Sequence, residues 1–541
     1  MNLEPLATLI NRRAAQSPRS TYLEDARSDR SIDYEGLASA VSAWRALLDD
    51  LGIPPAGGIL VDLADPLSFA VVHLAVVASG RRSVPVDPDV PWADLMRLSA
   101  LLGGAALLVS DRAARSKPAD LAKAPDPTTG GSDAAGPDAN AFGTAQFDVA
   151  TVDAASLLPA RVARAHRRLR TSGTGEPESA PATAHAASEG STVLFTSGST
   201  GQPKGVELPE SQLLFVANAI ARNNRLSRDD RGYNPLPLFH VNAEVVGLLA
   251  TLVAGATLVL DRRFHRTGFW ELLRERRITW LNAVPSILAV LASSGDIVPP
   301  ASLRFIRSAS APLPDAVRDA FKGIPLVVSY GMTEGASQIT ATPLGVPVRP
   351  GSVGVPLGAE VQVREDGRVL SPGEIGALWL RGPGIIGQYF LGRSPERFDA
   401  DGWLITGDLG YVDDDGYVYL VGRTDDVINR GGEKVYPAEV EDVLLKDPRV
   451  REAVVVARPD PILGHVPVAY VIPPAGLPRD EAEDLILVLR GRCESELPRF
   501  KRPVDIRMIA DLPRAATGKV QRSRVRVLAA ADAKTAAGAA A

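Results

Sequence analysis

The sequence is poor in cysteine, in net charge and in long apolar runs. Cys493 is the only cysteine among 541 residues, which excludes an internal disulfide and a thiolate metal site and fits a reducing cytoplasm. The net charge of −5 gives no reason to expect a nucleic-acid-binding surface. The longest apolar run, 245–260, contains Gly255 and is shorter than the roughly 20 residues that span a bilayer. We therefore expect a cytoplasmic protein without a membrane span, in which this run forms a buried helix followed by a strand.

The length and the first residues give two further expectations. The chain is too long for one hydrophobic core, so two or more domains are expected. The first residues, M-N-L-E-P-L-A-T-L-I-N-R-R, carry Glu4 and no long apolar core, so no signal peptide is expected.

Short β-branched segments alternate with helical patterns over most of the chain. Strands are expected at 57–63, 106–110, 192–196, 256–260 and 325–330. Helices are expected between them, at 68–79, 211–222 and 268–277. This alternation predicts α/β subdomains with largely parallel sheets. From about residue 354, closely spaced strands and turns predict an antiparallel, β-barrel-like region.

The end of the chain has a different pattern. A helical pattern at 437–445 precedes a strand pattern at 452–457, which predicts a small α+β domain. The Ala-rich tail after Val527 is expected to fray.

Residues 114–190 differ in composition from the rest, being rich in Ala, Pro, Gly, Ser, Thr and Asp. We expect much of this segment to be a flexible surface insertion. Its basic cluster at 160–170 is interpreted as a solvated helix face rather than as a nucleic-acid or membrane patch, because nothing else in the chain supports those functions.

A glycine-rich stretch, T-S-G-S-T-G-Q-P-K-G (196–205), follows the apolar residues 193–195. Its glycines let backbone N–H groups approach an anion, its hydroxyls add donors, and Lys204 adds a positive charge. The spacing is not that of the common P-loop, which needs a Ser or Thr after the lysine. The position directly after a buried strand favours phosphate binding over a simple flexible turn.

A second glycine pattern, G-P-G-I-I-G (382–387), matches the dinucleotide-binding spacing. A dinucleotide site requires a long helix directly afterwards. The residues that follow contain further glycines and a proline, so this interpretation is rejected.

Six stretches in order resemble the core motifs of the adenylate-forming superfamily, which contains acyl- and aryl-CoA synthetases, peptide-synthetase adenylation domains and beetle luciferases. They are T-S-G-S-T-G-Q-P-K-G (196–205), P-L-P-L-F-H (235–240), Y-G-M-T-E (330–334), D-G-W-L-I-T-G-D (401–408), G-R-T-D-D-V-I-N-R-G-G-E-K-V-Y-P-A-E-V-E (422–441) and P-R-A-A-T-G-K-V-Q-R (513–522). The resemblance extends from near the first residue to about residue 525, interrupted by 114–190.

The resemblance implies a fold and a reaction. A large N-terminal domain (1–423) would bind AMP and the acid, and a mobile lid domain (426–541) would follow a hinge at 424–425. The enzyme would be an ATP-dependent acyl-CoA synthetase that uses Mg²⁺, forms acyl-AMP and pyrophosphate, and transfers the acyl group to CoA. Since a carboxylate is a poor electrophile and the α-phosphate is anionic, catalysis would rest on charge neutralisation and positioning.

By the same resemblance, most of the predicted site binds the nucleotide. The β- and γ-phosphates would be held by Thr196, Ser197, Gly198, Ser199, Thr200 and Lys204. The adenine would lie against Tyr330, Gly331, Met332 and the segment Ser308, Ala309, Ser310, Ala311 and Pro312. Thr333 would contact the α-phosphate, and Glu334 would hold Mg²⁺. Asp408 and Arg423 would bind the ribose, and Lys519 would reach the bond that forms between the carboxylate and the α-phosphate. Each residue alone also has a plain structural reading, such as a solvated turn lysine for Lys519.

The second half-reaction is assigned in the same way. Asp425 would be the hinge, and Gly431 and Gly432 would leave room for the pantetheine arm of CoA. Phe500 and Arg502, in R-F-K-R-P, would contact the CoA nucleotide. The family often has a lysine where this chain has Val504 and an aromatic residue near Leu463.

The acid is the least defined part of the prediction. His240 resembles the residue that gates the site in relatives, and a buried core histidine is the alternative. The expected pocket wall is small and mostly neutral, comprising Asn242, Ala243, Gly247, Ser308 and Gln338. Malonate- and oxalate-type relatives tend to carry a second histidine where this chain has Asn242, and malonate-type relatives an arginine where it has Ser329. We therefore disfavour small dicarboxylates and expect a medium-chain, aryl or polycyclic acid.

Two other functions stay open. The enzyme could load a separate carrier protein, in natural-product biosynthesis for example, instead of CoA. A nucleotide-binding sensor without catalysis is the other, disfavoured by the presence of Lys519, Glu334 and Asp408. The sequence leaves open whether the protein is a monomer or a homodimer.

Overall fold

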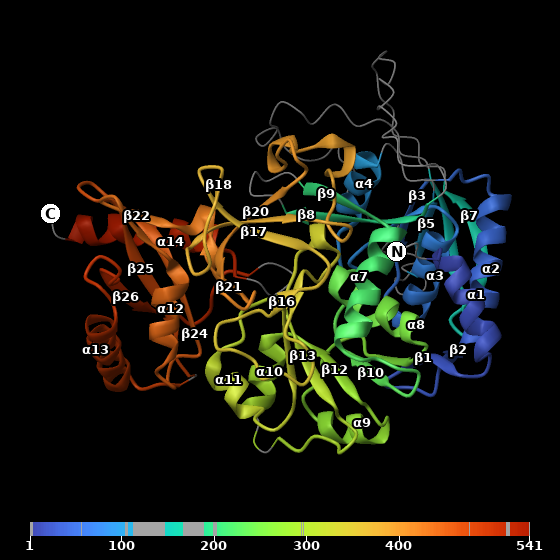
Figure 1. Ribbon diagram of the computed structural model, residues 1–541, viewed down its shortest axis with the longest axis horizontal. Coiled ribbons are helices and arrows are strands. Elements are labelled where there is room, and N and C mark those ends of the chain that lie inside the picture. Colours follow the sequence, from blue (N-terminus) through green and yellow to red (C-terminus); the bar gives the residue numbers. More distant parts are fainter. Residues whose placement is uncertain are drawn as a thin grey trace, which may run out of the picture. The chain divides into compact units, whose positions relative to one another are not determined.

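The computed structural model describes residues 4–55, 57–102, 107–111, 147–165, 189–197, 203–293, 295, 297–474, 476–514 and 520–539 (Figure 1). The chain divides into two compact units. Unit 1 comprises Met1–Glu360 and Leu380–Leu404, and unit 2 comprises Val361–Trp379 and Ile405–Ala541. The hinge predicted at 424–425 lies within unit 2, and its movement stays a prediction.

Unit 1 contains a nine-stranded sheet of order β16-β15-β14-β13-β12-β10-β11-β1-β2. Its inner strands β1, β10, β11, β12, β13 and β14 pair in parallel, and the edge strands pair antiparallel. The strand bounds are β1 Thr21–Asp25, β2 Ser31–Asp33, β10 Arg231–Asn234, β11 Thr257–Leu260, β12 Trp280–Ala283, β13 Phe305–Ser308, β14 Leu326–Tyr330, β15 Thr340–Ala341 and β16 Val355–Pro356. Strands β11 to β14 are fully buried, as expected for parallel strands covered on both faces.

A second sheet in unit 1 has seven strands in the order β7-β6-β5-β3-β4-β8-β9. Its bounds are β3 Gly58–Asp62, β4 Arg82–Pro85, β5 Leu107–Ser110, β6 Phe147–Val152, β7 Pro159–Ala165, β8 Ser191–Ser197 and β9 Pro203–Pro209. Antiparallel hairpins, β6–β7 and β8–β9, close its two edges.

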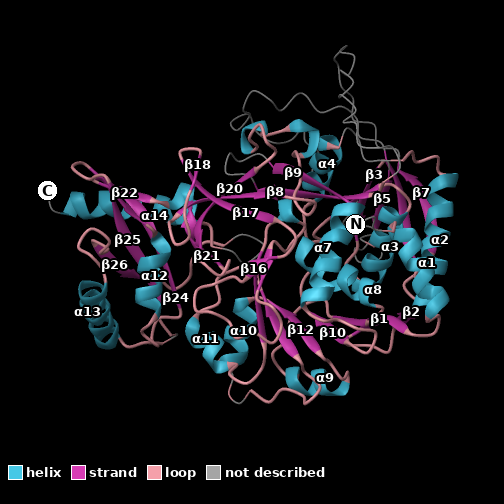
Figure 2. Cartoon of the chain, viewed as in Figure 1, coloured by secondary structure: helices cyan, strands magenta, loops and turns pink. Residues whose placement is uncertain are grey.

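Helices lie between the two sheets and on their outer faces (Figures 1 and 2). Helix α3 contacts β3 and β4 of one sheet and β1 of the other, and its apolar residues face both, so almost all of it is buried. The α-helices of unit 1 are α1 Leu6–Gln16, α2 Tyr34–Asp50, α3 Pro66–Ala78, α4 Trp92–Leu101, α7 Glu210–Asn223, α8 Ala250–Ala254, α9 Phe269–Glu275, α10 Pro285–Ala292 and α11 Asp315–Ala320. A π-helix, η1 Asn242–Leu249, runs directly into α8, and three 3₁₀ turns are η2 Thr333–Gly335, η3 Phe390–Gly392 and η4 Pro395–Arg397.

Unit 2 holds most of one five-stranded sheet and the whole of a second five-stranded sheet. The first has the order β18-β17-β19-β20-β21, and the second β23-β22-β25-β24 with β26 beside β25. The strands are β17 Glu360–Glu365, β18 Arg368–Val369, β19 Gly376–Arg381, β20 Leu404–Val412, β21 Val418–Arg423, β22 Ile428–Arg430, β23 Glu433–Val435, β24 Glu452–Asp460, β25 Gly464–Ile472 and β26 Asp505–Met508. The helical elements are the 3₁₀ turn η5 Thr424–Asp426 and the helices α12 Pro437–Leu445, α13 Arg479–Glu496 and α14 Arg522–Ala539.

The predicted elements agree with the structure in most places. The five expected strands correspond to β3, β5, β8, β11 and β14, and the helix expected at 437–445 is α12. The run 245–260 is a buried helix and a strand, although its first part is a π-helix. Only 3₁₀ turns, η3 and η4, follow 382–387, which agrees with the rejected dinucleotide motif.

Two expectations differ from the structure in the described residues. Residues 147–165 belong to the segment expected as a flexible insertion, yet they form β6 and β7, so the start of the basic cluster is a strand and not a helix face. The rest of the cluster, 166–170, lies outside the described residues. The tail expected to fray forms α14, because Val525 and Ala529 pack into a core with β24 and β25.

Candidate active site

The predicted adenine site lies where parallel strands of the nine-stranded sheet end. Strand β13 ends at Ser308, and the neighbouring strand β14 ends at Tyr330. Ser308 pairs in register with Val328, so the two strand ends lie side by side. Ligands of open α/β sheets bind at the carboxyl ends of such strands. The structure thus brings the segment 308–312 and the Y-G-M-T-E motif to one edge.

The backbone after Tyr330 turns back tightly on itself. Its carbonyl accepts a hydrogen bond from the Ile339 N–H at 2.9 Å, and the Met332 carbonyl accepts one from the Ser337 N–H at 3.1 Å. A Cβ at Gly331 would lie 1.4 Å from the Ser337 carbonyl oxygen, so no side chain fits there. This turn presents Thr333 and Glu334 on the 3₁₀ turn η2.

Glu334 and Lys204, which the sequence assigns to Mg²⁺ and phosphate, both contact Tyr389. The Tyr389 hydroxyl donates a hydrogen bond of 2.7 Å to Glu334 Oε1. Lys204 Nζ lies 5.6 Å from the centre of the Tyr389 ring. Burial, and then the negative charge of Glu334, raise the pKa of Tyr389, so it stays a neutral donor. Sequence reasoning missed this tyrosine.

The glycine-rich stretch belongs to the β8–β9 hairpin. Thr196 pairs with Lys204, and Ser197 pairs with Pro203. Both ends of the predicted phosphate loop are therefore strand residues, which fixes Lys204 at the base of the loop. Gly198, Ser199 and Thr200 lie outside the described residues.

Two of the predicted acid-pocket residues meet at a buried arginine that the sequence analysis did not select. Arg307 is 0% exposed; its Nε donates to Gln338 Oε1 at 2.9 Å and its Nη1 to Asn242 Oδ1 at 2.8 Å. Nη1 also donates to Asn282 Oδ1 at 3.0 Å. Burial lowers the pKa of Arg307 to about 9. A buried positive charge therefore lies against two residues of the wall that was expected to be mostly neutral.

Three other residues predicted for the acid pocket and its gate lie on η1 or shortly before it. Ala243 is buried within η1, and a Cβ at Gly247 would touch Asn234 and Leu258 of the sheet, so both pack η1 onto the strands. His240 is half-buried directly before η1, with its ring 4.6 Å from that of Phe239. It lies in the segment that follows the carboxyl end of β10, where a gating residue could act.

In unit 2 the predicted ribose pair is formed. Asp408 on β20 and Arg423 on β21 are register partners, and Arg423 Nη1 lies 3.0 Å from Asp408 Oδ1. The Asp408 N–H donates to Thr406 Oγ1 within β20. Asp408 is largely buried and Arg423 half-exposed, so the pair is accessible from one side.

The predicted hinge is held by α14. Arg526 Nη2 donates to the Asp425 carbonyl at 2.9 Å and also pairs with Asp426. Asp426 lies 3.7 Å from Arg522 as well. Release of Asp425 would therefore require these arginine contacts to change.

The two segments predicted for CoA also meet. Gly431 and Gly432 form the two-residue turn between β22 and β23, with φ of +61° and +93° that favour glycine. The neighbouring Arg430 donates through Nη1 to the Phe500 carbonyl at 2.9 Å and the Arg502 carbonyl at 3.2 Å. Sequence reasoning missed this connecting arginine.

The guanidinium of Arg502 donates hydrogen bonds to backbone carbonyls of the protein. Its Nε and Nη2 donate to the carbonyls of Leu497 and Glu494 at the end of α13. This capping accounts for much of its hydrogen-bonding capacity. Lys519, the predicted catalytic lysine, lies outside the described residues.

Comparison with known proteins decides the family. The sequence matches the AMP-binding enzyme family over residues 10–390 and the AMP-binding enzyme C-terminal domain over residues 439–519. This chain belongs to the AMP-binding enzymes. Its arrangement of a large α/β part and a smaller C-terminal part is the fold of that adenylate-forming superfamily.

Several named ligases are similar to this AMP-binding enzyme. A sulfoacetate–CoA ligase of Cupriavidus necator is 40% identical over 342 residues, and an oxalate–CoA ligase of Arabidopsis thaliana is 38% identical over 350 residues. Each alignment covers 62% of this chain and 66% of the relative, slightly less than two thirds of its length. A 2-succinylbenzoate–CoA ligase of Bacillus subtilis is 36% identical, covering 62% of this chain and 68% of the relative.

Solved structures cover nearly the whole chain. An o-succinylbenzoate CoA synthetase from Bacillus subtilis with an acyl-adenylate has a TM-score of 0.75 at 26% identity, covering 97% of this chain and 99% of the other. The same kind of enzyme with ATP and magnesium has a TM-score of 0.74 at 27% identity, covering 95% and 98%.

The residues present in this AMP-binding enzyme fit a magnesium nucleotide. The described residues contain no group of three or more His, Cys, Asp or Glu side chains that could hold a metal. Mg²⁺ commonly takes one or two carboxylates and completes its shell with substrate phosphates and waters. Glu334, half-buried and with Oε1 held by Tyr389, is suited to that role.

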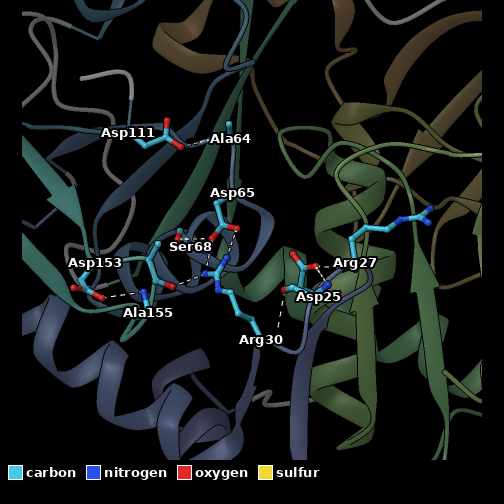
Figure 3. Close-up of polar contacts among 11 residues, drawn as sticks. Asp25, Arg27, Arg30, Ala64, Asp65, Ser68, Asp111, Asp153 and Ala155 are labelled. Atoms are coloured by element: carbon cyan, nitrogen blue, oxygen red, sulfur yellow. Dashed lines mark hydrogen bonds and ion pairs between the residues drawn. The ribbon is translucent and has the colours of Figure 1, made fainter. Parts of the chain in front are cut away.

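A separate cavity of about 370 Å³ is lined by several charged side chains, and some of them form ion pairs. Arg27 lies 2.7 Å from Asp261, and Figure 3 shows Arg30, at the edge of this region, directed at Asp65. None of the predicted site residues lines this cavity, so it is not assigned to the acid. Among the described parts of the chain, no helix is both long and apolar enough to cross a membrane.

Proposed function

We propose that this AMP-binding enzyme is an ATP-dependent acid–CoA ligase. It would convert a carboxylic acid and ATP to acyl-AMP and pyrophosphate, and then acyl-AMP and CoA to acyl-CoA and AMP. The observation that carries the proposal is the meeting of Lys204, Glu334 and Tyr389 beside the strand that ends at Tyr330. The CoA ligases among the relatives support the same reaction.

In the first half-reaction, a carboxylate oxygen of the acid attacks the α-phosphorus while the bond to pyrophosphate breaks. The residues would act by charge and position: Lys204 and the loop hold phosphate oxygens, and Glu334 holds the magnesium ion, which neutralises phosphate charge. Lys519 would donate to the oxygens of the forming bond. Asp408 would accept hydrogen bonds from the ribose hydroxyls, oriented by Arg423.

In the second half-reaction, the CoA sulfur attacks the acyl carbonyl carbon, loses its proton, and AMP leaves. The Gly431–Gly432 turn would border the pantetheine arm, because two residues without side chains leave room for a narrow chain. A separate carrier protein is the alternative acceptor. We also propose that the reaction takes place in the cytoplasm, where ATP and CoA are available.

The names of three relatives suggest a hypothesis about the acid. Sulfoacetate, oxalate and 2-succinylbenzoate each carry a second acidic group beside a carboxylate. For the present enzyme, the acid is to be decided by measurement rather than by these names.

The decisive experiment is mass spectrometry of products from the purified protein with ATP, Mg²⁺ and a panel of acids, each with and without CoA. The panel includes fatty, aryl, terpenoid, dicarboxylic and sulfonated acids. An acyl-CoA product supports the proposal and identifies the class of acid. Acyl-AMP that accumulates regardless of CoA indicates a carrier-protein acceptor. The absence of any ATP-dependent product with the whole panel contradicts the proposal.

A further inference from the structure

Arg307 is a fully buried cation near the end of β13. Among the described residues, no carboxylate forms an ion pair with it. Its three hydrogen bonds go to neutral amide oxygens, and its Nη2 is buried without a hydrogen-bond partner. A charge removed from water is costly unless it is paired and fully hydrogen-bonded. This unpaired charge lies against Asn242 and Gln338, two residues predicted to line the acid pocket.

The amides around Arg307 are oriented so that more donors point away from it. Gln338 is 2% exposed, and because its Oε1 accepts from Arg307 Nε, its Nε2 is the free end and has no partner. Asn242 Oδ1 accepts from both Arg307 and Asn282, which leaves its Nδ2 to donate outward to Ser310. The hydroxyls of Ser308 and Ser329 are also buried without a partner. The cluster therefore presents unused donors around a positive charge, which suits an anion.

The position of the cluster connects it to the nucleotide region. Arg307 immediately precedes Ser308 on β13 and lies opposite Asn282 on β12. Asn242 is half-buried at the start of η1, and its bond to the exposed Ser310 is long, at 3.2 Å. Asn242 is thus the outermost member of the cluster, and its bond to Ser310 connects the cluster to the segment predicted for adenine.

We infer that the acid substrate carries a second anionic group, a carboxylate or a sulfonate, and that Arg307 with Gln338 Nε2 binds it. The inference rests on the proposed function, since it assigns a subsite to the acid of that reaction. It reverses the argument against small dicarboxylates, which rested on Asn242 and Ser329 standing where some relatives have a histidine and an arginine. Arg307 supplies a positive charge from β13, the strand that pairs with β14, on which Ser329 lies.

An acid whose only anionic group is the reacting carboxylate would leave the cation uncompensated. A second anionic group would accept charge-assisted hydrogen bonds from Arg307 Nη2 and from the Gln338 amide. A site built around polar groups rejects ligands that leave those groups unpaired. Removal of Arg307 relieves an uncompensated buried charge but also leaves Gln338 Oε1 and Asn282 Oδ1 without this donor, so stability alone does not separate a binding role from a structural one.

The test uses pairs of acids matched in size: succinate with butyrate, sulfoacetate with propionate, and 2-succinylbenzoate with an analogue lacking one carboxyl group. Pyrophosphate release gives kcat/KM for each acid with the wild type, with Arg307→Met and with Arg307→Lys. Arg318→Met, which removes an arginine from a pair with the exposed Asp315, is the control variant.

We expect the wild type to prefer the acid with a second anion in at least one pair. Arg307→Met should lower kcat/KM for that acid by about 10–100-fold, the usual effect of losing a hydrogen bond to a charged group, and leave the matched monoanionic acid unchanged. Arg307→Lys should restore part of the loss, and Arg318→Met should have no effect.

The outcomes separate the two proposals. If no acid yields pyrophosphate, the proposed function fails. If acids are activated but monoanionic acids are equally good substrates, or if Arg307→Met slows both members of a pair equally, the proposed function stands and the inference about a second anion is wrong.

Discussion

Tyr389 shows how one hydroxyl can position the residue predicted to hold the metal. Its hydrogen bond to Glu334 Oε1 fixes one carboxylate oxygen and leaves the other available. The side chain comes from a loop 55 positions after Glu334 in the sequence. No pattern within that loop distinguishes it, so only the folded structure reveals the contact.

For Tyr389→Phe, we expect the Mg²⁺ concentration that gives half-maximal activity to rise and kcat/KM for ATP to fall by about 10-fold. The reason is the loss of a charge-assisted hydrogen bond while the ring beneath Lys204 is retained. Pyrophosphate release measured over a Mg²⁺ titration checks this. Tyr411→Phe, at a stacked tyrosine pair of unit 2, is the control and should behave as wild type. An unchanged Mg²⁺ dependence in Tyr389→Phe would exclude the positioning role.

Arg307 illustrates the limit of sequence reasoning at the residue scale. A strand of four residues, F-I-R-S, shows no alternation from which the buried face can be read. An arginine in such a strand is expected at the surface, since charged residues are rarely fully buried. The resemblance supplied the order of the motif residues; within unit 1 the structure places the strand ends at Ser308 and Tyr330 side by side, and within unit 2 it pairs Asp408 with Arg423. The contacts of the motif residues with Tyr389, Arg430 and Arg307 could not be derived from the resemblance.

At the scale of single elements, the predictions succeeded where a segment carries its own pattern. Helix α12 has the predicted bounds because Pro437 starts it and Val440, Val443 and Leu444 repeat at helical spacing. Strands β6 and β7 were missed because their composition resembles a flexible segment and their stability comes from pairing with each other and with β5. Pairing of that kind depends on partners distant in the sequence.

Helix α7 begins with Glu210, and ionisation of its largely buried carboxyl group destabilises the folded protein. Burial is the main cause that raises the pKa of Glu210 to about 7, well above its usual value. The folded state therefore holds a proton that the unfolded state has already lost, so the free energy of unfolding falls as pH rises from about 4.5 to 7 and levels off above. We expect Glu210→Gln to be more stable than wild type at pH 8 by about 1 kcal/mol, after allowing for partial solvent exposure, and equal to it at pH 4.5.

Urea unfolding at several pH values measures this difference. The amide oxygen that Glu210→Gln introduces can still accept a hydrogen bond from the Leu6 N–H, so that contact is retained in the variant. A constant difference between the two proteins from pH 4.5 to 8 would show that Glu210 does not titrate in this window.

The β22–β23 turn gives a test of the CoA assignment. For Gly432→Leu, we expect normal pyrophosphate release in the first turnover and a loss of thioester formation of more than about 10-fold, because the side chain would occupy the space assigned to pantetheine. Single-turnover assays that follow pyrophosphate and acyl-CoA separately provide the measurement.

The backbone strain of that substitution needs its own control. A non-glycine residue at positive φ costs about 1–2 kcal/mol wherever it occurs. Gly367, with φ of +79° and open space around it like Gly432, lies in the β17–β18 turn. Gly367→Leu should therefore cost similar stability and leave both half-reactions intact. Normal acyl-CoA formation by Gly432→Leu would remove this turn from the CoA path.

At the scale of the whole molecule, one protein must serve two half-reactions that need different groups at the same acyl carbon. In the proposed reaction Lys519 would act in the first and the Gly431–Gly432 turn in the second, and both follow the predicted hinge in the chain. Such an exchange is possible when one part of the chain rotates about a few backbone torsions. Asp425 is the candidate for those torsions, and its carbonyl is held by Arg526 in the described arrangement.

Asp425→Pro tests this exchange, because proline fixes φ near −65° and also restricts the preceding residue. We expect one half-reaction to proceed at its normal rate and the other to slow by about 10-fold or more, since only one arrangement stays accessible. Asp414→Pro, at the second position of the turn after β20, where proline is well tolerated, is the matched control and should affect neither step.

The two half-reactions can be followed independently, the first by pyrophosphate release and the second by conversion of synthetic acyl-AMP with CoA. If Asp425→Pro slowed both equally, the substitution would have damaged the site and not the exchange. If it slowed neither, the hinge would lie elsewhere in the chain, and the strands β17, β19 and β20, which cross between the two compact units, would be the next segments to test. A selective loss would show that domain alternation passes through Asp425.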